Sequence, residues 1–302
     1  MNLSIPFFWW RLEFIISSEL EESILWKLKI LNINEVSIES IPSKTSQKKL
    51  FIWLSSHKWS GSDREELIKS LLPLAKAFDK ELSYPKIERI KNSDWEREWK
   101  KYWKPDPIGD NLLILPAWLG APKEYEKRQI IRLDPGCAFG TGGHPTTRLC
   151  LSYLDLNPPI KLNVADLGCG SGVLGIAALS LGANKVLAVD IDNLAVHSAR
   201  GNARLNNLNL EEIVVFHGSI DKLESELDGE CIDLLFCNII YSVIAKIAPY
   251  FGRIVDKNGR LILSGLLISQ LEDVSKLFNS LGWNTVNSCE LEGWVLLEVR
   301  RR

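Results

Sequence analysis

The feature that most constrains the fold is the alternation of strand-like and helix-like segments from Asn163 to the C-terminus. The strand-like runs are rich in apolar, β-branched residues, and the segments between them repeat apolar residues at helical intervals. This pattern predicts a parallel sheet covered by helices on both faces. The chain ends with two strand-like segments, WNTVNSCELEG and WVLLEVRR, with only a Glu-Gly turn between them. We therefore expect five parallel strands followed by a terminal antiparallel hairpin.

A glycine-rich loop follows the first of these strands. The predicted strand Asn163–Leu167 leads into Gly168, Gly170 and Gly172, and glycine lets the backbone turn tightly and approach a ligand closely. Asp190 follows the second predicted strand, where a carboxylate can accept both hydroxyls of an adenosine ribose. Because ligands of open parallel sheets bind beyond the carboxyl ends of the strands, these residues predict a nucleoside-containing cofactor.

Two classes of cofactor are compatible with this loop. Residues 170–175 match the G-x-G-x-x-G motif of dinucleotide-binding enzymes, so NAD is one alternative. Asp166, however, lies at the strand end just before the first glycine, where a carboxylate would repel a pyrophosphate. The same carboxylate would favour the cationic amine and sulfonium of S-adenosylmethionine. The terminal hairpin is also foreign to the common dehydrogenase sheet, so both features favour S-adenosylmethionine.

Asn238 ends the fourth predicted strand, so its side chain should emerge at the same edge of the sheet. Its amide oxygen could face an incoming amine, although asparagine at a strand end is also a common turn former. We expect Asn238 to position the acceptor amine, and we assign no general base.

A second glycine-rich segment, DPGCAFGTGGHPTTR, contains Phe139 and Thr141 and precedes a predicted helix over Thr147–Leu154. Thr146 or Thr147 could cap this helix, whose free N–H groups could face a carboxylate. We expect the segment to form a lid over the cofactor, with an ordinary interdomain linker as the alternative. His144 is expected to shape this loop rather than to act as a base.

The first 92 residues have a different pattern, which predicts a smaller ferredoxin-like α+β domain. Its expected strands and helices, in the order β-α-β-β-α-β, are Phe8–Ile16, Ser18–Leu31, Glu35–Ile41, Leu50–Leu54, Ser62–Ala77 and Leu82–Ile90. Residues 93–110 are expected to form a linker helix, in which an aromatic stripe over Asp94–Trp103 packs against a neighbouring domain. Residues 111–302 are expected to form the cofactor-binding domain.

Composition narrows the classes of function. The net charge of −2 argues against a protein that grips nucleic acid with its whole surface. The six cysteines contain no C-x-x-C pair and do not cluster with the four histidines, so we expect no metal site and no disulfide framework. The N-terminus does not match a signal peptide, and no apolar run is long enough to span a membrane. We therefore expect a cytoplasmic monomer without a membrane partner.

Several of these motifs together resemble a known family. PGCAFGTGGHPTT, DLGCGSGVLGIAAL, AVDID, CNII and DWEREWKKYWKP are similar to motifs of the PrmA-type methyltransferases, which modify large-subunit ribosomal protein eleven. The resemblance extends from about Asp94 to the C-terminus, and the N-terminal domain matches in layout. It implies a seven-stranded class I (Rossmann-like) methyltransferase sheet in which Thr147, Gly168, Asp190 and Asn238 contact S-adenosylmethionine. It also implies that the N-terminal domain recognises the ribosomal protein, and that lysine side chains and the N-terminal amine are methylated.

The segment after the fourth strand indicates which kind of chemical group accepts the methyl group. Methyltransferases that act on planar amides or base amines commonly carry N-P-P-Y there, whereas this chain has Asn238-Ile239-Ile240-Tyr241. The missing prolines favour an aliphatic amine and disfavour a nucleic-acid methyltransferase. An NAD-linked dehydrogenase and a non-catalytic ribosome-binding module are the remaining alternatives, and methyl transfer would exclude both.

Overall fold

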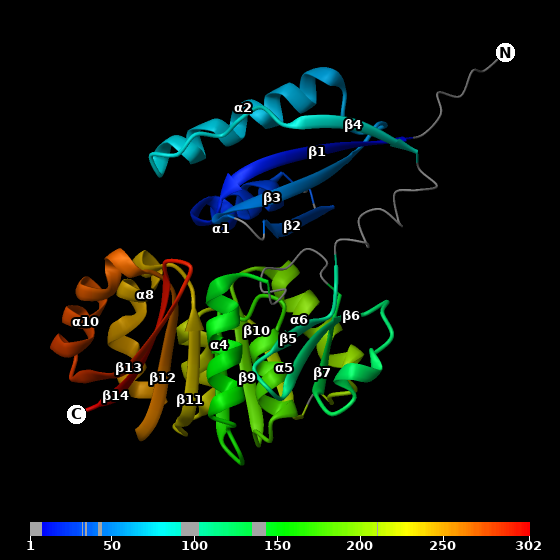
Figure 1. Cartoon of the computed structure of the whole chain (residues 1–302). Coiled ribbons are helices and arrows are strands. Elements are labelled where there is room, and N and C mark those ends of the chain that lie inside the picture. Colours follow the sequence, from blue (N-terminus) through cyan, green and yellow to red (C-terminus); the bar gives the residue numbers. More distant parts are fainter. Residues whose placement is uncertain are drawn as a thin grey trace. The chain divides into compact units, whose positions relative to one another are not determined.

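The computed structural model describes residues 8–31, 33, 35–41, 44–91, 103–134, 143–209 and 211–302. The chain divides into two compact units, residues 1–104 and residues 105–302 (Figure 1). None of the helices in the described ranges is long and apolar enough to cross a membrane.

The N-terminal unit contains a four-stranded antiparallel sheet in the order β2-β3-β1-β4. Its elements are β1 (Phe8–Ser17), the 3-10 turn η1 (Ser18–Leu20), α1 (Glu21–Ile30), β2 (Val36–Ile41), β3 (Lys44–Ser55), α2 (Gly61–Ala77) and β4 (Lys86–Lys91). Alternate residues of β1, among them Leu12 and Phe14, are buried in one core with Leu28 of α1 and Leu71 of α2. The predicted β-α-β-β-α-β order is therefore present.

Two strands of this unit differ in length from the predictions. β3 begins before the predicted Leu50 because Gln47 and Lys48 continue to pair with Ser17 and Ile16 of β1. Backbone pairing does not depend on apolar side chains, so a polar stretch can continue a strand. β4 begins only at Lys86, where its pairing with β1 starts.

The C-terminal unit contains a three-stranded sheet in the order β5-β6-β7 and a seven-stranded sheet in the order β10-β9-β8-β11-β12-β14-β13. Its strands are β5 (Asp106–Ile108), β6 (Leu112–Pro116), β7 (Gln129–Leu133), β8 (Asn163–Leu167), β9 (Lys185–Asp190), β10 (Ile213–His217), β11 (Ile232–Asn238), β12 (Val255–Leu267), β13 (Trp283–Leu291) and β14 (Trp294–Arg301). Its helices and 3-10 turns are η2 (Lys123–Tyr125), α4 (Pro145–Leu156), α5 (Val173–Ser180), α6 (Asn193–Leu205), α7 (Ile220–Leu227), α8 (Tyr241–Ile247), η3 (Ala248–Tyr250), α9 (Phe251–Ile254), η4 (Ile268–Gln270) and α10 (Leu271–Ser280).

The prediction of five parallel strands and a terminal hairpin is confirmed. Strands β8 to β12 pair in parallel, and β14 then pairs antiparallel with both β12 and β13. Both faces of the sheet are covered. Leu234 and Phe236 of β11 point into a core with α4, α5 and α6, whereas Leu235 and Cys237 point into a core with α7, α8, α9 and α10.

The linker helix predicted over residues 93–110 is wrong at its C-terminal end. Residues 92–102, which hold most of the predicted aromatic stripe, lie outside the described residues, but residues 106–108 form strand β5. Proline lacks a backbone N–H and disfavours helical conformation in the residue before it, so Pro105 and Pro107 oppose a helix here. The three-stranded sheet that β5 opens was absent from the predicted elements.

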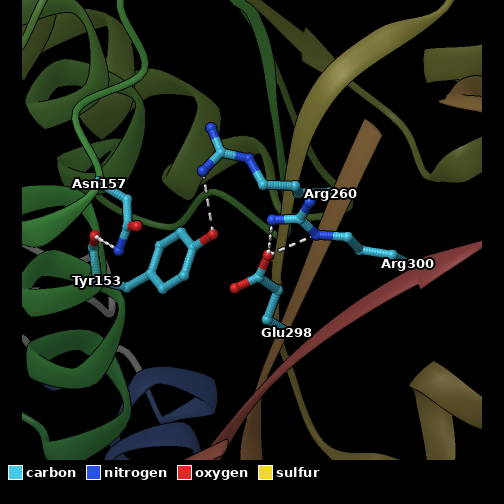
Figure 2. Close-up of polar contacts among 5 residues, drawn as sticks. All are labelled: Tyr153, Asn157, Arg260, Glu298 and Arg300. Atoms are coloured by element: carbon cyan, nitrogen blue, oxygen red, sulfur yellow. Dashed lines mark hydrogen bonds and ion pairs between the residues drawn. The ribbon is translucent and has the colours of Figure 1, made fainter. Parts of the chain in front are cut away.

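Polar side chains meet where the C-terminal end of α4 lies beside the large sheet (Figure 2). Arg260 of β12 donates to the hydroxyl oxygen of Tyr153 at 3.3 Å, and burial raises the pKa of that hydroxyl to about 12. On β14, Glu298 accepts hydrogen bonds from Arg300 at 2.9 and 2.7 Å. At the helix end the side-chain amide of Asn157 donates to the backbone carbonyl of Tyr153 at 3.0 Å. Of these contacts, the bond from Arg260 joins α4 to the sheet, and the opposite end of α4 lies at the site described next.

Candidate functional site

The loop between β8 and α5 is built from glycines in the left-handed region. Gly168, Gly170 and Gly172 have φ values of +77°, +55° and +78°. A Cβ added at Gly168 would lie 2.5 Å from Cγ2 of Ile239, and one added at Gly172 would lie 3.0 Å from Cβ of Ala199. Glycine is therefore required at both positions, by conformation and by the close approach of neighbouring side chains.

Asp190, at the end of β9, ties this loop to the next crossover. Its Oδ2 accepts a hydrogen bond from the backbone N–H of Gly170, and its Oδ1 accepts one from Asp192, both at 2.9 Å. The backbone N–H groups of Gly168 and Cys169 donate to the carbonyl oxygen of Val189 at 2.9 and 3.1 Å. A carboxylate has about four lone-pair sites, so Asp190 can accept two further hydrogen bonds.

Five of the predicted site residues line a single cavity at the carboxyl edge of the sheet. The cavity is lined by Thr147, Asp166, Gly168, Cys169, Gly170, Val173, Leu174 and Asn238. Asp190 is not among its lining residues and adjoins it through the hydrogen bond to Gly170. The fold thus brings together side chains from α4, β8 and β11 that are far apart in the sequence.

Asp166 is the buried acid of this cavity. Its side chain is 1% exposed, and burial raises its pKa from 3.8 to about 7. The backbone N–H of Gly175, which donates to Oδ2 at 3.3 Å, opposes this rise, and the charge of Asp190 adds to it. A cation in the cavity would favour the ionised carboxylate and lower this pKa again.

Asn238 contributes an acceptor that the described residues do not satisfy. Its Nδ2 donates to the hydroxyl oxygen of Thr147 at 3.5 Å, which joins β11 to the first turn of α4. Its Oδ1 is buried and accepts no hydrogen bond from the part of the chain that the structure describes. Buried polar atoms normally have partners, so this oxygen can accept a hydrogen bond from a donor outside the described residues.

The start of α4 differs from the prediction. The helix begins at Pro145, and the residue that caps it is His144, whose Nδ1 accepts from the backbone N–H of Thr146 at 3.3 Å. The prediction that Thr146 or Thr147 caps the helix is wrong because proline is favoured at the first helical position, so the helix starts at Pro145 and the cap falls on the residue before it. His144 is 3% exposed, and its ring lies 4.9 Å from that of Trp294 in a T-shaped arrangement.

Two predicted site residues, Phe139 and Thr141, lie outside the described residues, so their place is not tested. Within the ranges that are described, no group of histidine, cysteine or acidic side chains could hold a metal ion. The sequence analysis missed Cys169, Val173 and Leu174 in the cavity wall. Their apolar character is typical of any buried helix start, so no local signal marks them.

The sequence and the structure are similar to those of known proteins. The family model described as ribosomal protein L11 methyltransferase (PrmA) matches residues 8–302. A ribosomal protein L11 methyltransferase of Prochlorococcus marinus (strain MIT 9303) is 49% identical over 303 residues, with all of both chains covered. One from Parasynechococcus marenigrum (strain WH8102) is 45% identical over 284 residues, covering 94% of this chain and 98% of the relative. The crystal structure of a ribosomal protein L11 methylase from Lactobacillus delbrueckii subsp. bulgaricus superposes with a TM-score of 0.60 at 30% identity, covering 66% of this chain and all of that one.

Proposed function

The chain belongs to the ribosomal protein L11 methyltransferase family, and from that premise we propose that it methylates amines of ribosomal protein L11 with S-adenosylmethionine. The proposed acceptors are lysine side chains and the N-terminal amine. The observation that carries the proposal is the cavity in which the glycine loop, the buried acid Asp166 and the unsatisfied Oδ1 of Asn238 meet. This set of groups suits a cofactor with a nucleoside at one end and positive charge at the other.

Each part of the site has a proposed role. The glycine loop forms one wall of the cavity, and its backbone packs so closely that a Cβ at Gly168 would collide with Ile239. Asp190 keeps lone pairs for the two ribose hydroxyls while its bonds to Gly170 and Asp192 hold it in place. Asp166 provides negative charge toward the cationic part of the cofactor. Thr147 is proposed as a further contact, beside Asn238.

Bound S-adenosylmethionine supplies an electrophilic methyl group on a sulfonium. The acceptor amine must lose its proton before it can attack, and for an unperturbed lysine this costs about 4–5 kcal/mol at pH 7. Desolvation in the cavity and the nearby positive charge both lower this cost. The proposed role of Asn238 Oδ1 is to accept a hydrogen bond from the amine and so restrict its orientation in the cavity.

We further propose that the enzyme acts in the cytoplasm as a monomer and that its direct substrate is protein rather than nucleic acid. The N-terminal unit is the proposed recognition domain for the ribosomal protein. Among the described residues, its hydrophobic core contains no member of the two core clusters of the C-terminal unit. This separation of the cores is consistent with a separate module.

The experiment is incubation of the protein with labelled S-adenosylmethionine and ribosomal protein L11, followed by mass mapping of the product. Label on lysine side chains and on the N-terminal amine is expected. Label confined to RNA in a parallel reaction with whole ribosomes would overturn the substrate assignment. The site assignment is tested separately with Asp190→Ala, which should abolish cofactor binding in calorimetry, and unchanged affinity would refute it.

A further inference from the structure

Asn202, on α6, uses its whole side-chain amide to bridge two backbone segments. The side chain is 1% exposed. Its Nδ2 donates to the carbonyl oxygen of Ser171 in the glycine loop at 3.0 Å, and its Oδ1 accepts from the backbone N–H of Asp134 at 2.9 Å. Asp134 directly follows β7, so one buried residue connects the glycine loop to the end of the small sheet.

Asn206, one helical turn later, makes a related contact with β7. Its Oδ1 accepts from the backbone N–H of Arg132, and its Nδ2 donates to the carbonyl oxygen of the same residue, both at 2.8 Å. Residues four apart on a helix are separated by about 6 Å, and residues two apart on a strand by about 6.6 Å. The two asparagines therefore match Arg132 and Asp134, which are two residues apart at the end of β7.

The two asparagines differ in what they reach. Asn202 contacts the glycine loop, whereas the hydrogen bonds of Asn206 within the described residues go to Arg132 and to the carbonyl oxygen of Asn202. The same helix contacts the loop again at Ala199, which packs against Gly172. At its N-terminal end, the backbone N–H of Asp192 holds Oδ1 of Asp190. Both ends of α6 thus act on the residues that surround the cofactor cavity.

We propose that Asn202 is a positioning residue for cofactor binding. By holding the carbonyl of Ser171, it keeps the adjacent Gly170 N–H directed at Oδ2 of Asp190, so that the loop and the ribose acceptor keep their relative position. It contacts neither the cavity nor the proposed acceptor, so it acts through the loop. The inference rests on the cofactor site proposed above.

The test compares Asn202→Ala with Asn206→Ala as a matched control. For each variant the Kd of S-adenosylhomocysteine is measured by calorimetry, the KM for S-adenosylmethionine and kcat by methyl transfer, and Tm by thermal unfolding. Both variants lose side-chain hydrogen bonds and should lower Tm, the buried Asn202 more than the half-buried Asn206. Asn202→Ala should also raise Kd and KM about tenfold with kcat unchanged. In this variant part of the free energy of cofactor binding is used to order the glycine loop, which Asn202 no longer holds. Asn206→Ala should leave Kd and KM at their wild-type values.

A second variant separates the two bonds of Asn202. In Asn202→Asp the introduced carboxylate can still accept from Asp134 N–H, but it cannot donate to the Ser171 carbonyl. Because position 202 is 1% exposed, burial should raise the pKa of this carboxyl group above its ordinary value. Relative to wild type at the same pH, the Kd of the variant should therefore be raised at about pH 8 and should fall toward about pH 5, as protonation restores a donor.

Equal Kd values for Asn202→Ala and Asn206→Ala, or a wild-type Kd for Asn202→Asp at the higher pH, would overturn the proposal. If one variant at this position does not fold, the other decides. If neither folds while Asn206→Ala does, the proposal is also rejected, because Asn202 is then required for folding itself. Failure of the cofactor site is recognised independently, since Asp190→Ala would then keep its affinity.

Discussion

The buried carboxyl group of Asp166 predicts that the stability of the cofactor-free protein falls as the pH approaches neutrality. Its pKa is about 7 in the folded protein, mainly because of burial, against 3.8 ordinarily. Between these values the folded protein binds more protons than the unfolded chain, so the free energy of unfolding decreases as pH rises. One pKa unit corresponds to about 1.4 kcal/mol, so the loss amounts to about 4 kcal/mol and is complete above about pH 7.

The perturbation is Asp166→Asn, which removes the titration and nearly preserves the shape of the side chain. The amide oxygen can still accept from Gly175 N–H, as Oδ2 of the carboxylate does. At about pH 8 the cofactor-free variant should be more stable than wild type by up to about 4 kcal/mol, and this difference should shrink as the pH falls and disappear only near about pH 4, the ordinary pKa of the carboxyl group. Its affinity for S-adenosylmethionine should be weaker, because the negative charge toward the cationic cofactor is missing.

Urea unfolding at several pH values measures the first effect, and calorimetry measures the second. Calorimetry in buffers of different ionisation enthalpy adds a third readout near pH 7. There, a bound cation that lowers the pKa of Asp166 should make wild type release more protons on binding than the variant does. An identical pH dependence of stability in both proteins would refute the titration of Asp166. Equal affinity and equal proton release would refute its place beside the positive charge.

Three further predictions concern single contacts. Gly168→Ala should lower Tm and weaken cofactor binding in calorimetry, since its φ of +77° and the 2.5 Å approach to Ile239 both oppose a Cβ; full affinity would contradict the tight fit. Asn238→Ala should lower kcat about 10- to 100-fold in methyl-transfer assays through misplacement of the amine, and an unchanged kcat would remove that role. Asp155→Ala should lower the free energy of unfolding in urea by about 2–3 kcal/mol, because Oδ1 and Oδ2 of Asp155 accept hydrogen bonds from Asn111 and Asp110 N–H at 2.9 Å. Cofactor affinity should not change, and a loss of affinity at full stability would contradict this prediction.

Local periodicity was sufficient for much of the fold. Strands buried on both faces, such as β8 and β11, are continuous apolar runs in the sequence, and the helices between them repeat at their own period. Gly168 and Asp190 could be predicted at the carboxyl edge of the sheet because their positions at strand ends follow from the strand pattern alone. The terminal hairpin was equally visible, since a two-residue turn leaves no room for a crossover helix.

Other features depend on contacts between distant segments, which the sequence by itself does not determine. β3 is lengthened by pairing with β1, and β5 is a strand because β6 lies beside it. The exposure of a carboxyl group is likewise decided by what packs around it, so the raised pKa of Asp166 required the tertiary structure.

The features of the site also divide into those that the sequence determines and those that depend on tertiary contacts. The sequence determined that a glycine loop, two acids and an asparagine stand at the ends of neighbouring strands. The tertiary structure decided that Asn238 meets Thr147 of α4 and that Asn202 joins the loop to the end of β7. Side-chain hydrogen bonds over such separations leave no periodic trace in the sequence, because a buried asparagine on a helix looks the same whether it holds a functional loop or only packs.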